Sequence, residues 1–207
     1  MIDFAALAKW YATNGSHYPW RNTRDPYKVL MTEIMLQRTR ADIVAKMFPT
    51  FFGRYPTLKA LAKASSKEIA EMLTPLGLTH RIPRIVELTA AMSKMSGIPR
   101  DRDALLELPG VGPYIADAIL CYSFGMPTVP IDVNIRRLLG RYYGGVDTKR
   151  HAEKALRSFL TRRKREMDIR KLNWAFLDLA KTVCMTNIPT CHECPLAVGC
   201  KYARSRN

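Results

Sequence analysis

Residues 108–125, LPGVGPYIADAILCYSFG, carry the clearest structural pattern in the chain. The first five of these residues, LPGVG, connect an apolar segment that ends at Leu106 to a second helix that begins at Pro113. Proline is favoured in the first turn of a helix, and glycine adopts backbone conformations that are closed to other residues. The pattern therefore predicts two short helices joined by a tight turn, a helix-hairpin-helix.

The turn also predicts phosphate binding. Glycines leave the backbone amides uncovered, and amides at a helix N-terminus, where the macrodipole is positive, attract anions. The expected DNA-contacting residues of this turn are Leu108, Gly110, Val111 and Gly112. A purely structural helix connection is the alternative. The net charge of +15, from 33 basic and 18 acidic residues, also favours a polyanionic partner, although composition alone does not separate DNA from other polyanions.

Apolar residues recur at helical spacing along almost the whole chain, which predicts an all-α fold. Ser65 followed by Glu68 indicates a capping box at a helix start, and Pro83 fits the first turn of the next helix. No apolar stretch approaches the roughly 20 residues that a membrane helix needs, and the N-terminal segment reads as an amphipathic helix instead of a signal peptide. We therefore expect no membrane association and a cytoplasmic, nucleoid-associated location.

Four cysteines lie together near the C-terminus, separated by six, two and five residues, in a segment without another cysteine. Thiolates bind zinc or iron-sulfur clusters, and a central CxxC pair in a set of four favours metal over two disulfides. The spacing alone does not decide between zinc and iron. The four expected ligands are Cys184, Cys191, Cys194 and Cys200.

Together with the segments PWR (19–21), TEIMLQRT (32–39) and VPIDVN (129–134), these motifs resemble the helix-hairpin-helix DNA glycosylase superfamily of endonuclease III and MutY. The resemblance covers nearly the whole chain. It implies two helical lobes with the active site in the cleft between them. Residues 23–135 would form a six-helix barrel that contains the helix-hairpin-helix at about 104–122. Residues 1–22 and 136–207 would form a lobe in which the four cysteines hold a [4Fe-4S] cluster.

Asp132 matches the catalytic aspartate of this family. Cleavage of an N-glycosidic bond develops positive oxocarbenium character on the sugar, and a nearby carboxylate stabilises it. Asp132 also stands where it would cap a helix beginning near Val133, a structural role that is compatible with catalysis.

Tyr114 occupies the position where bifunctional relatives have a lysine that attacks the sugar and forms a Schiff base. A tyrosine hydroxyl forms no imine, so the resemblance implies a monofunctional enzyme with little or no abasic-site lyase activity. Tyrosine at this position is typical of thymine-mismatch glycosylases. The structural alternative is an aromatic side chain that fills a helix seam.

Glu33 matches the glutamate that protonates adenine in MutY, and burial would favour the protonated form that a general acid needs. In thymine-mismatch relatives this glutamate has a less certain role, so positioning of the base or of water stays open. Gln37 and Arg38 match side chains that enter the duplex in place of the flipped base. MutY-like chains tend to have two glutamines there and thymine-mismatch enzymes two arginines, so this mixed pair leaves the substrate open.

The loop between the first two cluster cysteines, residues 185–190, contains no lysine or arginine, whereas relatives have a basic loop that touches phosphate. The corresponding charge is expected at Arg162–Arg165 or at Lys201 and Arg204.

The resemblance as a whole predicts a monofunctional DNA glycosylase of base excision repair that removes thymine or uracil opposite guanine. Its partner would be double-stranded DNA with a mismatched or damaged base, and the family acts as monomers. Adenine excision from A·G or A·8-oxoguanine, supported by Glu33 and Gln37, is the nearest alternative. A catalytically silent DNA-binding module is a further alternative, which Asp132 argues against.

Overall fold

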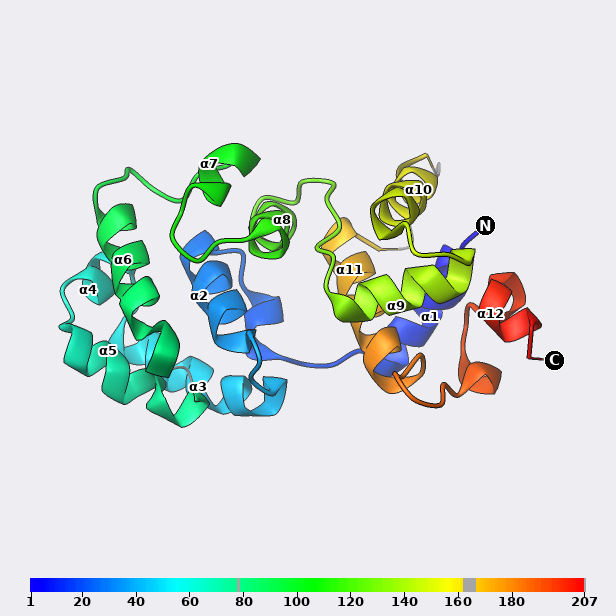
Figure 1. Cartoon of the computed structure of the whole chain (residues 1–207), viewed down its shortest axis with the longest axis horizontal. Helices are drawn as coiled ribbons and strands as arrows, with labels where there is room; N and C mark the ends of the chain where they lie inside the picture. The colour runs from blue at the N-terminus through cyan, green and yellow to red at the C-terminus, as the bar shows by residue number, and fades with distance from the viewer. Residues whose placement is uncertain (78, 162–166, 207) are drawn as a thin grey trace. The chain divides into compact units, whose positions relative to one another are not determined.

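The computed structural model describes residues 1–77, 79–161 and 167–206. Within these ranges all regular elements are helical and no strand occurs, so the predicted all-α fold class is confirmed (Figure 1). No helix there is both long and apolar enough to cross a bilayer. The basic run Arg162–Arg165 lies outside the described residues.

The chain folds into two compact units. His17–Phe124 form one, called the middle unit below, and Met1–Ser16 with Gly125–Asn207 form the other, called the terminal unit. Both divisions fall earlier in the chain than the boundaries expected from sequence, after residues 22 and 135.

The middle unit is built from short helices that bury apolar stripes against one another. Its α-helices are α2 (Pro26–Leu36), α3 (Ala41–Arg54), α4 (Leu58–Ala62), α5 (Ser66–Leu73), α6 (Ile82–Ser93), α7 (Arg102–Leu106) and α8 (Pro113–Tyr122). Helix α2 packs against α3 and α8, and α6 packs against α4 and α5. Because α2 and α8 are neighbours, side chains on them can meet although they lie far apart in the sequence.

Local sequence signals set the starts of these helices. Ser65 Oγ accepts a bond from the Glu68 amide at 3.2 Å, and Glu68 Oε2 accepts from the Ser65 amide at 2.8 Å, so the predicted capping box of α5 is confirmed. Pro83 lies in the first turn of α6 and Pro113 in the first turn of α8, as predicted.

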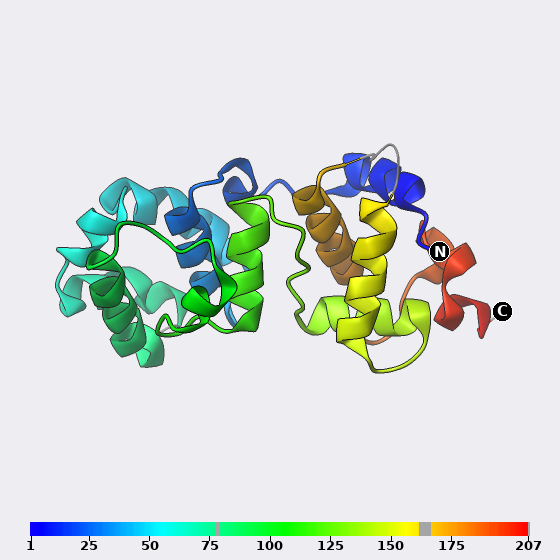
Figure 2. The same cartoon turned by 90° about the horizontal axis from the view of Figure 1, so that it is seen from above.

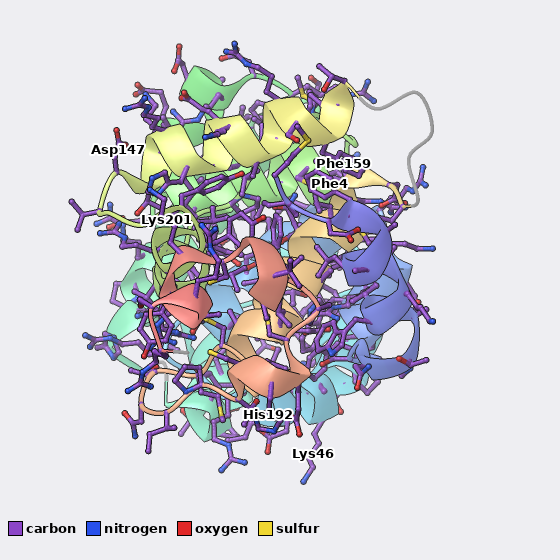
Figure 3. All side chains as sticks on the ribbon, turned by 90° about the vertical axis from the view of Figure 1, so that its right-hand side faces the viewer. Phe4, Lys46, Asp147, Phe159, His192 and Lys201 are labelled. Atoms are coloured by element: carbon purple, nitrogen blue, oxygen red, sulfur yellow. The ribbon has the colours of Figure 1, made fainter. Side chains whose placement is uncertain are left out.

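The terminal unit joins the N-terminal helix to Gly125–Asn207 (Figure 2). Its helices are α1 (Phe4–Asn14), α9 (Val133–Tyr143), α10 (Thr148–Leu160), α11 (Ile169–Thr182) and α12 (Lys201–Arg204). Helix α11 packs against α1 and α9, and α9 packs against α10 and α12. The buried rings of Phe4 and Phe159 meet edge to face with centroids 5.3 Å apart, which fastens α1 to α10 (Figure 3).

Aspartate is the usual helix cap of this protein. An aspartate carboxylate accepts a backbone amide bond at the start of α1, α2, α7, α9, α10 and α11. The residues are Asp3, Asp25, Asp101, Asp132, Asp147 and Asp168. Capping by itself therefore does not distinguish Asp132 from the other five aspartates.

Candidate functional site

The predicted turn at residues 108–112 connects α7 to α8. Gly110 has φ +81°, a left-handed conformation that favours glycine, and Gly112 stands at the N-cap of α8. Leu108 and Val111 are buried and anchor the turn to the unit. Among the described residues, no protein acceptor takes the amide of Gly110 or Gly112, so both amides are available to an oxygen ligand.

A small cavity of about 230 Å³ lies beside this turn. It is lined by Pro109 and Gly110 from the turn, by Gln37 from the end of α2, and by Arg81 and Arg84. The structure thus brings the predicted phosphate-binding turn and one predicted duplex-entering residue to a common surface. Sequence reasoning missed the two arginines, because neither belongs to a recognisable motif.

Gln37 and Arg38 lie in the turn that follows α2. The guanidinium of Arg81 donates to both the backbone oxygen and the side-chain oxygen of Gln37. Arg38 is exposed and has φ +61°, the only non-glycine residue with positive φ among those described. Such a conformation costs a non-glycine residue about 1–2 kcal/mol. The turn is therefore held in a strained shape, in which Arg38 is exposed and the Gln37 side chain is bound by Arg81.

Glu33 and Tyr114 belong to one neighbourhood in the middle unit, on the packed helices α2 and α8. Glu33 is only 5% exposed, and Tyr114 is half-buried. Burial raises the pKa of Tyr122 well above its ordinary value, the charges of Tyr114 and Glu33 add to the rise, and Arg21 opposes it. Tyr122 and Arg21 are thus members of this group that sequence reasoning did not single out.

Asp132 lies in the terminal unit, at the N-cap of α9, as the sequence allowed. Its Oδ1 accepts bonds from the amides of Asn134 at 2.9 Å and Ile135 at 2.7 Å. Its Oδ2 accepts from Asn134 Nδ2 at 2.7 Å. The carboxylate is half-buried and fixed in orientation, and Oδ2 retains a lone pair for another partner.

A chain of hydrogen bonds connects Asp132 to the first of the four clustered cysteines. Asn134 donates to Asp132 and accepts from the Arg137 guanidinium at 3.1 Å. Arg137 also donates to the backbone oxygens of Cys184, at 2.8 Å, and Ala180, at 2.7 Å. Sequence reasoning gave no reason to place the cysteines near Asp132, because the contact depends on how α9 packs against α11.

The four clustered cysteines line one apolar cavity, together with residues such as Leu138 and Leu196. Burial raises the pKa of the Cys194 thiol to about 11, and the nearby thiols of the other three cysteines contribute to the rise. The residues that the structure describes contain no group of three or more His, Cys, Asp or Glu side chains suited to a metal ion. A cluster of four irons takes one thiolate per iron, so its ligands surround a wider space than the ligands of a single ion do.

Arg141 holds the loop that follows Cys184. Its guanidinium donates to the backbone oxygens of Met185 at 2.6 Å and Thr186 at 3.0 Å, and Nη1 stands 3.5 Å from Cys184 Sγ. The loop itself has no basic side chain, so the nearby positive charge comes from α9.

The predicted site residues thus divide between the two units. The middle unit holds Glu33, Tyr114, Gln37, Arg38 and the helix-hairpin-helix, whereas the terminal unit holds Asp132 and the four cysteines.

Comparison with known proteins gives consistent matches. A family model described as "HhH-GPD superfamily base excision DNA repair protein" matches residues 31–162. Thymine-DNA glycosylase of Aeropyrum pernix is 37% identical over 95% of this chain and 92% of the relative. Thymine/uracil-DNA glycosylase of Methanothermobacter thermautotrophicus is 33% identical over 97% and 93%. A solved structure of a thermostable thymine-DNA glycosylase superposes with a TM-score of 0.87 at 31% identity, covering 98% of this chain and 95% of that one.

Proposed function

The chain belongs to the HhH-GPD superfamily of base excision DNA repair proteins, and from this membership we propose that it is a monofunctional DNA glycosylase acting on thymine or uracil opposite guanine. The observation that carries the proposal is its similarity, at 33–37% identity over more than nine-tenths of both chains, to relatives named for thymine and uracil. Tyr114, in place of a nucleophilic lysine, supports the monofunctional part.

The proposed reaction hydrolyses the bond between the base and C1′ of deoxyribose. As the base departs with the bonding electron pair, positive charge develops on the sugar, and the ionised carboxylate of Asp132 stabilises it. Water then adds to C1′ and gives up a proton, for which the free lone pair of Oδ2 is a suitable acceptor. The products are the free base and an abasic site.

Glu33 and Tyr114 are proposed to act on the extruded base and the attacking water. Glu33 is buried and stands in the electrostatic neighbourhood of Tyr114 and Tyr122, so it is suited to position the base or water through hydrogen bonds. The Tyr114 hydroxyl cannot form an imine with C1′. The reaction therefore stops at the abasic site without strand cleavage.

Duplex DNA carrying the mismatch is the proposed partner, bound by a monomer. The uncovered amides of Gly110 and Gly112 would seat a backbone phosphate, which positions the protein without reading sequence. Gln37, held by Arg81, and Arg38, presented by its strained backbone, would fill the space that the flipped base leaves.

The four clustered cysteines are proposed to hold a [4Fe-4S] cluster, and their convergence on one cavity supports this assignment. When bound, the cluster would cross-link Cys184, Cys191, Cys194 and Cys200 and so stabilise the C-terminal part of the terminal unit. Ligation requires thiolates, and the raised pKa of Cys194 means that its ligation releases a proton at neutral pH.

The test incubates the protein with duplexes that contain T·G, U·G, A·G or A·8-oxoguanine, with and without alkali. We expect thymine and uracil to be released, with strand breaks only after alkali. Adenine release alone would contradict the proposed substrate and favour the adenine glycosylase alternative. Breaks without alkali would contradict the monofunctional assignment, and mismatch binding without release of any base would indicate a silent binding module.

A further inference from the structure

A third and larger cavity, of about 640 Å³, lies within the terminal unit. Its walls come from the end of α9, one face of α10, the turn Ala197–Gly199 and the short helix α12. Lys201, which begins α12 (Figure 3), is one of the lining residues. The volume falls in the range of small-molecule sites, about 300–1,000 Å³. None of the residues assigned to base excision above lines this cavity.

The cavity collects positive charge without a matching negative charge. Four of its lining residues are exposed cations, Arg150 and Lys154 from α10 and Lys201 and Arg204 from α12. No aspartate or glutamate lines it, and among the described residues none of the four forms an ion pair. Such a convergence of like charge in a concave surface attracts anions.

Buried polar groups in the same cavity also lack partners. Tyr142 is only 4% exposed, yet its hydroxyl has no hydrogen-bond partner among the described residues, and the same holds for Ser158 Oγ and His151 Nδ1. Leaving such a group unsatisfied costs about 1–3 kcal/mol. Gly199 adjoins the Tyr142 hydroxyl so closely that any side chain there would collide with it.

Besides Cys200 and Cys194, the acidic group that acts electrostatically on Tyr142 is the carboxylate of Asp3. Asp3 does not line the cavity, because its carboxylate caps α1 by accepting the amide of Ala6 at 2.9 Å. The cavity is therefore lined both by exposed cationic side chains and by buried hydroxyl groups that can donate hydrogen bonds. An anion with several oxygens satisfies both kinds of group at once.

We propose that this cavity binds a phosphate-bearing anion, with Lys201 and Arg204 facing Arg150 and Lys154 across it and the Tyr142 and Ser158 hydroxyls donating to its oxygens. The phosphate belongs either to a free compound or to the backbone of bound DNA. Only the second source rests on the proposed glycosylase function.

The experiment compares the full-length protein with Lys201→Met, Lys154→Met and Tyr142→Phe. Lys9→Met is the matched control, since it removes one positive charge from an exposed position on the same unit, outside the cavity. Calorimetric titration with inorganic pyrophosphate tests the free source. The slope of log Kd against log salt for a fully matched duplex tests the DNA source, and base excision from T·G duplexes is recorded separately.

If the ligand is a free phosphate compound, we expect pyrophosphate to bind saturably. Each cavity variant should then weaken the affinity for pyrophosphate about 10-fold, the effect of losing one charged or buried donor, and Lys9→Met should not weaken it. For a DNA phosphate, pyrophosphate binding is absent, and the salt slope falls by about 1 in each lysine variant of the cavity but not in Lys9→Met. Equal effects of Lys9→Met and the cavity variants, or no effect in either titration, would overturn the proposal. Base excision is measured separately from phosphate binding. Whichever phosphate source the titrations support, the excision result therefore tests the glycosylase assignment independently.

Discussion

Asp132 caps α9, and we propose that the same carboxylate also acts in base excision. Two amide bonds to Oδ1 make it a helix cap like five other aspartates of this chain, and together with the bond from Asn134 Nδ2 to Oδ2 they fix the orientation of the carboxylate. A group that is already fixed before the substrate binds needs little reorganisation during the reaction, which is where electrostatic catalysis gains most.

This dual role makes Asp132→Asn an informative variant. Asparagine caps helices as well as aspartate does, so α9 should persist, while the loss of negative charge should lower the excision rate by about 10²–10⁴-fold without loss of mismatch binding. Single-turnover kinetics and a binding assay on T·G duplexes measure the two effects. Asp3→Asn, at the cap of α1, is the matched control and should keep full activity. Unchanged turnover in Asp132→Asn would remove this residue from the mechanism.

In the proposed mechanism, Tyr114 replaces the lysine amine that would attack the sugar, so that water is the attacking group. Tyr114→Lys should gain some ability to form a Schiff base with the sugar, detectable as a covalent protein–DNA complex after borohydride reduction. Tyr114→Phe removes only the hydroxyl and should give no such complex. If Tyr114→Lys traps no DNA, residue 114 does not face C1′.

At the scale of elements, the two glycines of the helix-hairpin-helix differ in backbone conformation and in the space around them. Gly110 has φ +81°, and an added Cβ would lie 3.3 Å from Arg84 Cγ, whereas Gly112 has an ordinary φ of −94° and open space around its Cα. Alanine should therefore cost about 1–2 kcal/mol at Gly110, or roughly 2–8 °C in melting temperature, and little at Gly112. Thermal unfolding of the two variants measures the difference, and equal melting temperatures would contradict the left-handed assignment.

Helix α9 connects Asp132 at its start to the cysteine loop through Arg137. Arg137→Met removes three hydrogen bonds, two of them to backbone oxygens of residues 180 and 184. We expect a lower melting temperature, faster loss in air of the visible absorbance of the proposed iron-sulfur cluster, and slower base excision, because Asn134 loses a partner. Arg136→Met, an exposed neighbour on the same helix, serves as the control for charge and should leave melting temperature and absorbance unchanged.

The sequence predicts these elements well where the signal is local. The capping box at Ser65, the prolines that begin α6 and α8, and the glycine turn all depend on residues within one or two helical turns of each other. The hydrogen bonds from Arg81 to Gln37 and from Arg141 to residues 185 and 186 join residues that are 44 or 45 positions apart, and no sequence periodicity predicts such a pairing. These long-range contacts emerge only from packing, and they shape the site.

At the scale of the whole molecule, the division into two units predicts how the protein responds to loss of the proposed cluster. Purified without oxygen, the protein should contain iron and acid-labile sulfide in equal amounts, as a [4Fe-4S] cluster requires. After oxidation and chelation of the iron, amide hydrogen exchange should accelerate in residues 183–203, while α2 and α8 of the middle unit keep their protection. Loss of protection throughout the chain would show that the cluster stabilises both units, and an absence of sulfide would point to zinc.

The discontinuous terminal unit also constrains how the protein is made. Helix α1 leaves the ribosome before the middle unit does, yet Phe4 can contact the ring of Phe159 only after the entire middle unit has been synthesised. Cys200, the last expected cluster ligand, emerges later still. The middle unit can therefore fold during translation, whereas the apolar face of α1 stays uncovered until its partner helices α10 and α11 have been synthesised. The terminal unit can be completed only after translation has passed Cys200.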